Sequence, residues 1–280
     1  MSKERELSSI KTMRHKKTFA KKSLGQNFLQ SSAVRTQILD FSTKSDGSFP
    51  EVVLEIGPGL GFMTCKLVQK AQEFIAVEMD DRAIELLNKD FAHRDNFQLI
   101  HGDILATDID NIFEQKKYSV IANIPYNITS PILRKFLDRT KNQPDQMVLM
   151  VQREVGEKIC LDPEKGNRSL LSISVEIFAE TLYGFTVPPE AFSPAPKVFS
   201  AVIKAIIRKI PLVEKKDQND FFTVVQAGFS EKRKKLGNTL PKFFGLPMEP
   251  LLKGIDPDRR PQTLTIEEWK ILTKNFQDVR

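Results

Sequence analysis

The sequence predicts an α/β fold with a mostly parallel, doubly wound sheet, followed by a small all-helical domain. Three observations support this prediction. Apolar strand patterns alternate with helix patterns over the first two thirds of the 280 residues. The strand at 52–56 enters a glycine turn, Gly57-Pro58-Gly59-Leu60-Gly61, and a helix follows. The next strand ends at Glu78, about twenty residues after the first glycine, where an acid can bind ribose hydroxyls. Together they are typical of a nucleotide-binding unit.

The remaining elements follow from local pattern. In a sheet ordered 3-2-1-4-5, strand one lies beside strand four, and ligands bind beyond their carboxyl ends. Two last strands, 181–187 and 199–207, are expected to pair at the sheet edge. The other expected strands cover 73–77, 97–100, 118–122 and 147–151. The expected helices cover 32–41, 62–70, a segment that opens at 80–82, 129–139, 153–159, 169–178, 221–228, 232–244 and the segment from 266. The predicted organisation is a basic arm (1–22), a large domain (23–210) and a helical domain (211–280).

The charge is concentrated at the N-terminus. Residues 1–22 hold eight Lys and Arg against two Glu, a net of +6, which equals the net charge of the whole chain. An arm of this kind favours phosphate binding, with a solubility tail as the alternative. A second basic cluster occupies 232–235, and the alternative to phosphate binding there is a solvated helix face. The two cysteines lack paired spacing, so a reducing cytoplasm is expected, and no apolar run suits a membrane span. A monomer is also expected.

The fourth strand ends at an unusual loop, Asn123-Ile124-Pro125-Tyr126. Pro125 stiffens the backbone, and an amide beside a flat ring suits a flat heterocycle that carries an amino group. A tight turn with a half-buried tyrosine is the alternative. Asp103, after the third strand, can accept a hydrogen bond from an adenine amine or cap the next turn. A rigid, proline-rich loop, 188–198, holds Phe192 in place as a second aromatic ring near the site. The alternative is a plain connector in which Phe192 is a core residue.

The chemistry needs neither a side-chain nucleophile nor a metal, because no His, Cys or Ser–base pair and no metal-ligand spacing accompanies these strand ends. Methyl transfer from S-adenosylmethionine to an amine fits, since the sulfonium carbon is already electrophilic and the enzyme supplies orientation. The Asn123 side-chain oxygen and the Ile124 carbonyl could draw the two N–H bonds of adenine out of plane. Tyr126 would stack on a base removed from its helix.

Several motifs in order resemble the family of small-subunit ribosomal RNA adenine dimethyltransferases. They are Gln26-Asn27-Phe28-Leu29, EIGPGLG at 55–61, Glu78, HGD at 101–103, NIPYNI at 123–128, FSPAPKVFSAV at 192–202 and FSEKRKKLGNTL at 229–240. The resemblance implies a class I methyltransferase sheet with an antiparallel edge strand. It implies S-adenosylmethionine binding by Asn27, Leu29, Gly57, Gly59, Glu78, Asp103 and Asn123. It implies a catalytic loop of Asn123, Ile124, Pro125 and Tyr126, with Phe192 beside the target base. The basic residues expected to bind RNA are Lys21, Lys22, Lys232, Arg233, Lys234 and Lys235.

The implied substrate is a pair of adjacent adenosines in a hairpin loop near the 3′ end of the small-subunit RNA, each dimethylated at N6. The implied partner is that RNA or the immature small subunit. One alternative is the related family that methylates a large-subunit adenine and confers macrolide resistance, although FSEKRKKLGNTL and the segment 260–269 favour the small subunit. A non-catalytic RNA-binding assembly factor is another, and a nicotinamide dehydrogenase, which leaves NIPY unexplained, is a third.

Overall fold

The computed structural model describes residues 25–160, 168–231 and 233–280. The expected arm at 1–22, with Lys21 and Lys22, and Lys232 lie outside the described residues. The described residues form two compact units, one within 25–156 and 182–206 and the other within 157–181 and 207–280. The change of unit after residue 206 lies close to the domain boundary expected after residue 210. The segment 157–181 joins the C-terminal unit because its helix α8 (Leu170–Phe178) contacts α9 (Gln218–Ser230).

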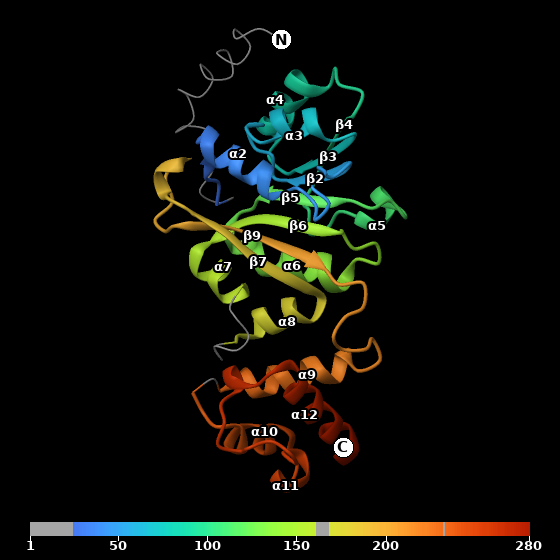
Figure 1. Ribbon diagram of the computed structural model, residues 1–280, viewed down its shortest axis with the longest axis vertical. Coiled ribbons are helices and arrows are strands. Elements are labelled where there is room, and N and C mark those ends of the chain that lie inside the picture. The colour runs from blue at the N-terminus through green and yellow to red at the C-terminus, as the bar shows by residue number, and fades with distance from the viewer. Residues whose placement is uncertain (1–24, 161–167, 232) are drawn as a thin grey trace. The chain divides into compact units, whose positions relative to one another are not determined.

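A seven-stranded sheet has the order β4-β3-β2-β5-β6-β9-β7 (Figure 1). The first five of these strands confirm the predicted order 3-2-1-4-5, and they pair in parallel. β9 runs antiparallel to β6 and lies between β6 and β7, as expected for the last two strands. The strands are β2 (Val52–Ile56), β3 (Glu73–Glu78), β4 (Phe97–His101), β5 (Ser119–Asn123), β6 (Gln146–Gln152), β7 (Ala179–Val187) and β9 (Ser200–Ile207).

Helices cover both faces of this sheet (Figure 1). The apolar sides of α2 (Ser32–Phe41), α3 (Thr64–Lys70) and α4 (Asp81–Phe91) share one core with inward residues of β2, β3, β5, β6 and β9. On the opposite face lie α6 (Thr129–Arg134), which continues as a π-helical turn at Lys135–Arg139, and α7 (Arg153–Ile159). The α7 residue Gly156 approaches β9 so closely that a Cβ there would lie 2.9 Å from that of Ala201. Burial on both faces explains the continuous apolar runs of the central strands.

Several local features differ from the sequence prediction. A short helix, α5 (Ile109–Phe113), was not expected, and a two-stranded sheet pairs β1 (Phe28–Leu29) with β8 (Phe192–Ser193). The helix expected over 232–244 begins only at Leu236, as α10 (Leu236–Phe244). The Leu236 N–H donates to the Arg259 carbonyl at 2.9 Å, and the preceding residues Arg233, Lys234 and Lys235 lie outside the helix.

The C-terminal unit consists mainly of helices packed on an aromatic core. It includes α11 (Met248–Leu251) and α12 (Ile266–Val279), which contacts α9 and α11. A capping box starts α12, because the Thr265 and Glu268 side chains each accept a hydrogen bond from the other's backbone N–H. Trp269 is fully buried in this unit. Within the described parts of the chain, no helix is long and apolar enough to cross a membrane.

Candidate active site

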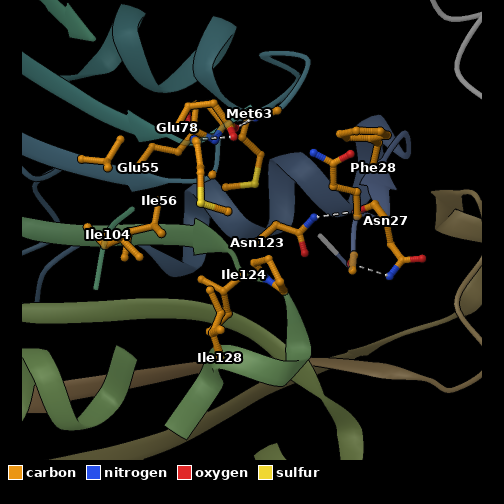
Figure 2. A pocket seen from close by; sticks show the side chains of 18 of the residues that line it. Asn27, Phe28, Glu55, Ile56, Met63, Glu78, Ile104, Asn123, Ile124 and Ile128 are labelled. Carbon is orange, nitrogen blue, oxygen red and sulfur yellow. Dashed lines mark hydrogen bonds between the residues drawn. The ribbon is translucent and has the colours of Figure 1, made fainter. Parts of the chain in front are cut away.

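A pocket opens in the first unit where the parallel strands β2 to β5 end (Figure 2). The glycine turn follows β2, Glu78 ends β3, Asp103 follows β4 and Asn123 ends β5, so four strand ends each contribute to the lining. The segment around β1 closes the pocket from another side. The pocket brings together ten of the residues that the sequence singled out, which are Asn27, Leu29, Gly57, Gly59, Glu78, Asp103, Asn123, Ile124, Pro125 and Tyr126.

The glycine turn brings the backbone to the pocket. Gly57 has φ +63°, a conformation that L side chains rarely adopt, and a Cβ built on it would meet no atom within 4 Å. Gly59 has φ +55°, and a Cβ there would lie 2.8 Å from the Phe28 ring. Gly57 therefore leaves open space for a ligand against the main chain, whereas Gly59 lets the ring of Phe28 pack on the turn.

Glu78 holds this turn in place. One carboxylate oxygen accepts from the Gly59 N–H at 2.9 Å, and the other accepts from the N–H groups of Met79 and Asp80 at 2.8 and 2.9 Å. The residue is 6% exposed and borders the pocket. A carboxylate has about four acceptor positions, so one remains for a hydroxyl of a bound ligand.

The Asn123 amide has a fixed orientation. Its Nδ2 donates to the backbone carbonyl of Asn27 at 3.1 Å (Figure 2), and a carbonyl can only accept. The side-chain oxygen of Asn123 is therefore the atom left to accept a hydrogen bond in the pocket. The side chain of Asn27 is held in turn, because its Nδ2 donates to the Gly25 carbonyl at 3.3 Å.

The Tyr126 side chain is hydrogen-bonded to β9, two strands away from β5 in the sheet. Its hydroxyl and that of Ser200, the first residue of β9, are 2.6 Å apart. Burial raises the pKa of the Tyr126 phenol above its ordinary value, and the hydrogen bond with Ser200 opposes this shift. The phenol thus stays neutral near pH 7, and the ring is partly exposed at the pocket.

Asp103 stabilises the turn that follows it, which is one of its two expected roles. Its Oδ1 accepts from the Leu105 N–H at 2.9 Å, so the carboxylate does stabilise the following turn. Its Oδ2 has no hydrogen-bond partner among the residues that the structure describes. The side chain is exposed and lines the pocket. A ligand amine can therefore be accepted without disrupting the turn.

The structure adds one acid that sequence reasoning did not assign to the pocket. Glu55 precedes the glycine turn, lines the pocket and is 2% exposed. Thr64 Oγ1 donates to its Oε2 at 2.6 Å. Burial raises the pKa of Glu55 to about 8, with a further contribution from the charge of Glu78. An acid within a strand otherwise rich in Val, Leu and Ile was the available signal. Further lining residues that were not anticipated are Phe28, Met63, Ile104 and Ile128.

Other predicted residues lie elsewhere. The strand pair β1–β8 sets Phe192 opposite Leu29 and turns its ring into the core, where it is 5% exposed, so little of this ring is available to a target base in this structure. In the C-terminal unit, Lys234 forms an ion pair with Glu231. Lys235 pairs with Asp258 at 3.0 Å, whereas Arg233 is exposed. No group of three metal-ligating side chains gathers among the described residues.

Comparisons with known proteins agree with this geometry. A family model described as ribosomal RNA adenine dimethylase matches residues 17–278. A ribosomal RNA small subunit methyltransferase A from Dehalococcoides mccartyi is 40% identical over 263 residues, which span 92% of this chain and 88% of that relative. A dimethyladenosine transferase structure from Plasmodium falciparum is 24% identical with a TM-score of 0.73, over 90% of this chain and 98% of that one. The 23S rRNA methyltransferase ErmE is 22% identical with a TM-score of 0.69, over 90% of this chain and 100% of that one, and these two structures show a shared fold.

Proposed function

Because the chain belongs to the ribosomal RNA adenine dimethylase family, we propose that it dimethylates N6 of two adjacent adenosines in a hairpin loop near the 3′ end of the small-subunit RNA. The observation that carries this proposal is the oriented amide of Asn123, which presents an acceptor oxygen where four strand ends meet. An acceptor at this point suits a substrate amine, which offers N–H donors.

The donor in this proposal is S-adenosylmethionine, which supplies an electrophilic methyl carbon. The residues of the pocket fit it. The open space at Gly57 admits a ligand against the backbone, Glu78 retains an acceptor position for ribose, and Asp103 retains one for the adenine amine. Asn27 and Leu29, at the β1 side of the pocket, complete the proposed cofactor site.

Asn123 and Ile124 act on the substrate amine in this mechanism. The lone pair of an adenine amine is delocalised into the ring, so the amine is a poor nucleophile. Hydrogen bonds from its two N–H groups to the Asn123 oxygen and the Ile124 carbonyl would pull these bonds out of the ring plane and localise the lone pair. Both acceptors are preorganised, because Asn27 fixes the amide and Pro125 restricts the backbone after Ile124.

Tyr126 positions the base. Its hydroxyl is hydrogen-bonded to Ser200, which fixes the orientation of the ring. A ring with a fixed orientation can stack on a flipped adenine. The phenol stays neutral near pH 7, so it brings no negative charge close to the phosphates of the RNA. The loop would therefore orient the amine, and the proton that the amine loses on methylation would pass to water instead of to a protein base.

The substrate assignment rests on the relatives and on motifs beyond the pocket. The small subunit is named for the Dehalococcoides mccartyi relative, and FSEKRKKLGNTL at 229–240 points the same way. The C-terminal unit and the basic residues around 232–235 would recognise the RNA or the immature subunit. That the enzyme is a cytoplasmic monomer stays a prediction. A large-subunit adenine is the remaining alternative, since the ErmE fold is also similar.

The test is transfer of a labelled methyl group from S-adenosylmethionine to naked small-subunit RNA, to immature small subunits and to large-subunit RNA. We expect label on two adjacent adenosines of the small-subunit RNA, with N6,N6-dimethyladenosine as the product. Label confined to the large subunit would replace the proposed substrate with the alternative. RNA binding without any methyl transfer would favour the assembly-factor function.

A further inference from the structure

An exposed segment with one aromatic ring and one cation connects the proline-rich loop to β9. Lys197, Val198 and Phe199 are consecutive and exposed, and Phe199 keeps 43% of its surface in solvent. A phenylalanine is normally buried, and the neighbouring Ser200 is completely buried. The exposed ring is therefore a feature that the packing of this unit does not explain.

This segment lies at the same sheet edge as the catalytic loop. Ser200, the next residue, is the partner of Tyr126. In the strand register, Asn123 of β5 lies beside Met150 of β6, and Met150 lies beside Val202 of β9. Phe199 precedes Val202 by three residues. It is therefore two strands away from Asn123 and three residues nearer the sheet edge where the pocket opens. Strand geometry gives a separation of roughly 14 Å from Asn123, about 10 Å in each direction. A neighbour of the target in the same RNA strand can reach this position.

The chemistry of the segment suits a nucleotide. The Arg153 guanidinium lies 5.1 Å from the centroid of the Phe199 ring, and the Arg153 N–H donates to the Phe199 carbonyl at 2.9 Å, so the two residues hold each other in place. Lys197 is exposed and has no ion-pair partner in the described part of the chain. A π-face stabilised by a cation stacks on a base, and the cations attract the adjoining phosphates.

We propose that Phe199, supported by Arg153 and Lys197, is a stacking platform for an RNA base that neighbours the target adenosine. This inference rests on the proposed function, because it assumes an RNA substrate at Asn123. It also identifies which aromatic of the 192–202 segment meets RNA. Phe192, the residue expected to do so, is 5% exposed, whereas Phe199 is 43% exposed.

The experiment uses an RNA hairpin that carries 2-aminopurine at each position flanking the adenosine pair in turn. Binding of the wild-type protein should quench the fluorescence at one flanking position through stacking. Phe199→Ala should abolish this quenching and raise the KM for RNA about 5- to 150-fold, the usual range for losing one stacked base. The kcat at saturating RNA and the affinity for S-adenosylmethionine should stay within twofold. Phe199→Tyr should restore quenching and KM, because its ring can still stack.

Tyr183→Ala is the matched control, because Tyr183 is an aromatic of the same unit that is 36% exposed on β7. It should leave both quenching and KM unchanged. Unchanged quenching and KM in Phe199→Ala would overturn the proposal. An increase in KM for immature subunits without one for the RNA hairpin would also overturn it, because it would indicate a protein partner at this surface. The quenching measures contact with the RNA base and does not depend on methyl transfer. A wild-type protein that transfers no methyl group therefore refutes the proposed function but leaves the platform measurable.

Discussion

Replacing Glu55 with glutamine tests whether the pocket contains a carboxylic acid that stays protonated near neutral pH. Glu55 is 2% exposed, and burial is the largest cause that raises its pKa to about 8 from an ordinary value of 4.5. The Thr64 hydroxyl opposes this shift by donating to the carboxyl, and the charge of Glu78 adds to it. Glutamine keeps the size of the side chain and an oxygen that can accept from Thr64, but it does not ionise.

The direction of the pH effect follows from proton linkage. The folded pKa of Glu55 lies above the unfolded one, so between pH 4.5 and 8 the folded state retains a proton that the unfolded state has released. The contribution of this proton to stability is complete below the unfolded pKa and is lost as the pH rises through the folded pKa. Between pH 5.5 and 7.5 these two pKa values give a loss of about 2.5 kcal/mol in the free energy of unfolding. For a unit of this size, the loss lowers Tm by roughly 5–10 °C.

The assay is thermal or urea unfolding of the wild type and of Glu55→Gln at pH 5.5 and 7.5. Because other groups also titrate, the informative quantity is the change in stability of the wild type minus that of the variant. We expect the wild type to lose about 2.5 kcal/mol more than the variant over this interval. Glu85→Gln, a substitution at an exposed position of α4, should behave like the wild type. Equal pH dependence in the wild type and Glu55→Gln would show that the buried acid is already ionised in the folded protein.

Three further perturbations test the site and the arm. Gly59→Ala should weaken S-adenosylmethionine binding at least tenfold by calorimetry, because its Cβ would lie 2.8 Å from an aromatic ring. Gly47→Ala, with φ +80° but no atom within 4 Å, should cost about 1–2 kcal/mol of stability and leave binding unchanged. Asn123→Ala should lower kcat on the order of 100-fold or more while RNA affinity persists, and an equal loss of affinity would show a structural role. Deleting 1–22 should weaken RNA binding and flatten its salt dependence, since eight cations leave, and an unchanged slope would exclude phosphate contacts.

The order of the sheet could be predicted because its signals are local and repeated. Strands 52–56 and 73–78 are apolar runs that end at special residues, a glycine turn in one case and an acid in the other. Parallel strands must be joined by crossovers, and the helix patterns between them supplied these. The pocket residues at the strand ends were accessible by the same logic, since carboxyl ends of parallel strands converge on one edge.

The features that escaped prediction depend on contacts distant in sequence. Arg233, Lys234 and Lys235 are good helix formers, yet the Leu236 N–H donates to the Arg259 carbonyl and α10 begins only at Leu236, so tertiary structure overrides propensity. The pair β1–β8 joins segments more than 160 residues apart through two residues each, too few for any periodicity. The burial of Phe192 follows from that pairing and was therefore equally hidden.

The same long-range pairing explains why the NIPY motif indicates the chemistry but not its orientation. A side-chain amide is symmetric in shape, so the motif cannot say whether Asn123 presents its oxygen or its nitrogen to a substrate. The Asn27 carbonyl, 96 residues away, decides this by accepting from Nδ2. That carbonyl is placed by the backbone that leads into β1, which β8 holds by pairing with Phe28 and Leu29. The β1–β8 pair thus supports the proposed catalytic arrangement, although none of its backbone contacts involves the proposed reacting groups.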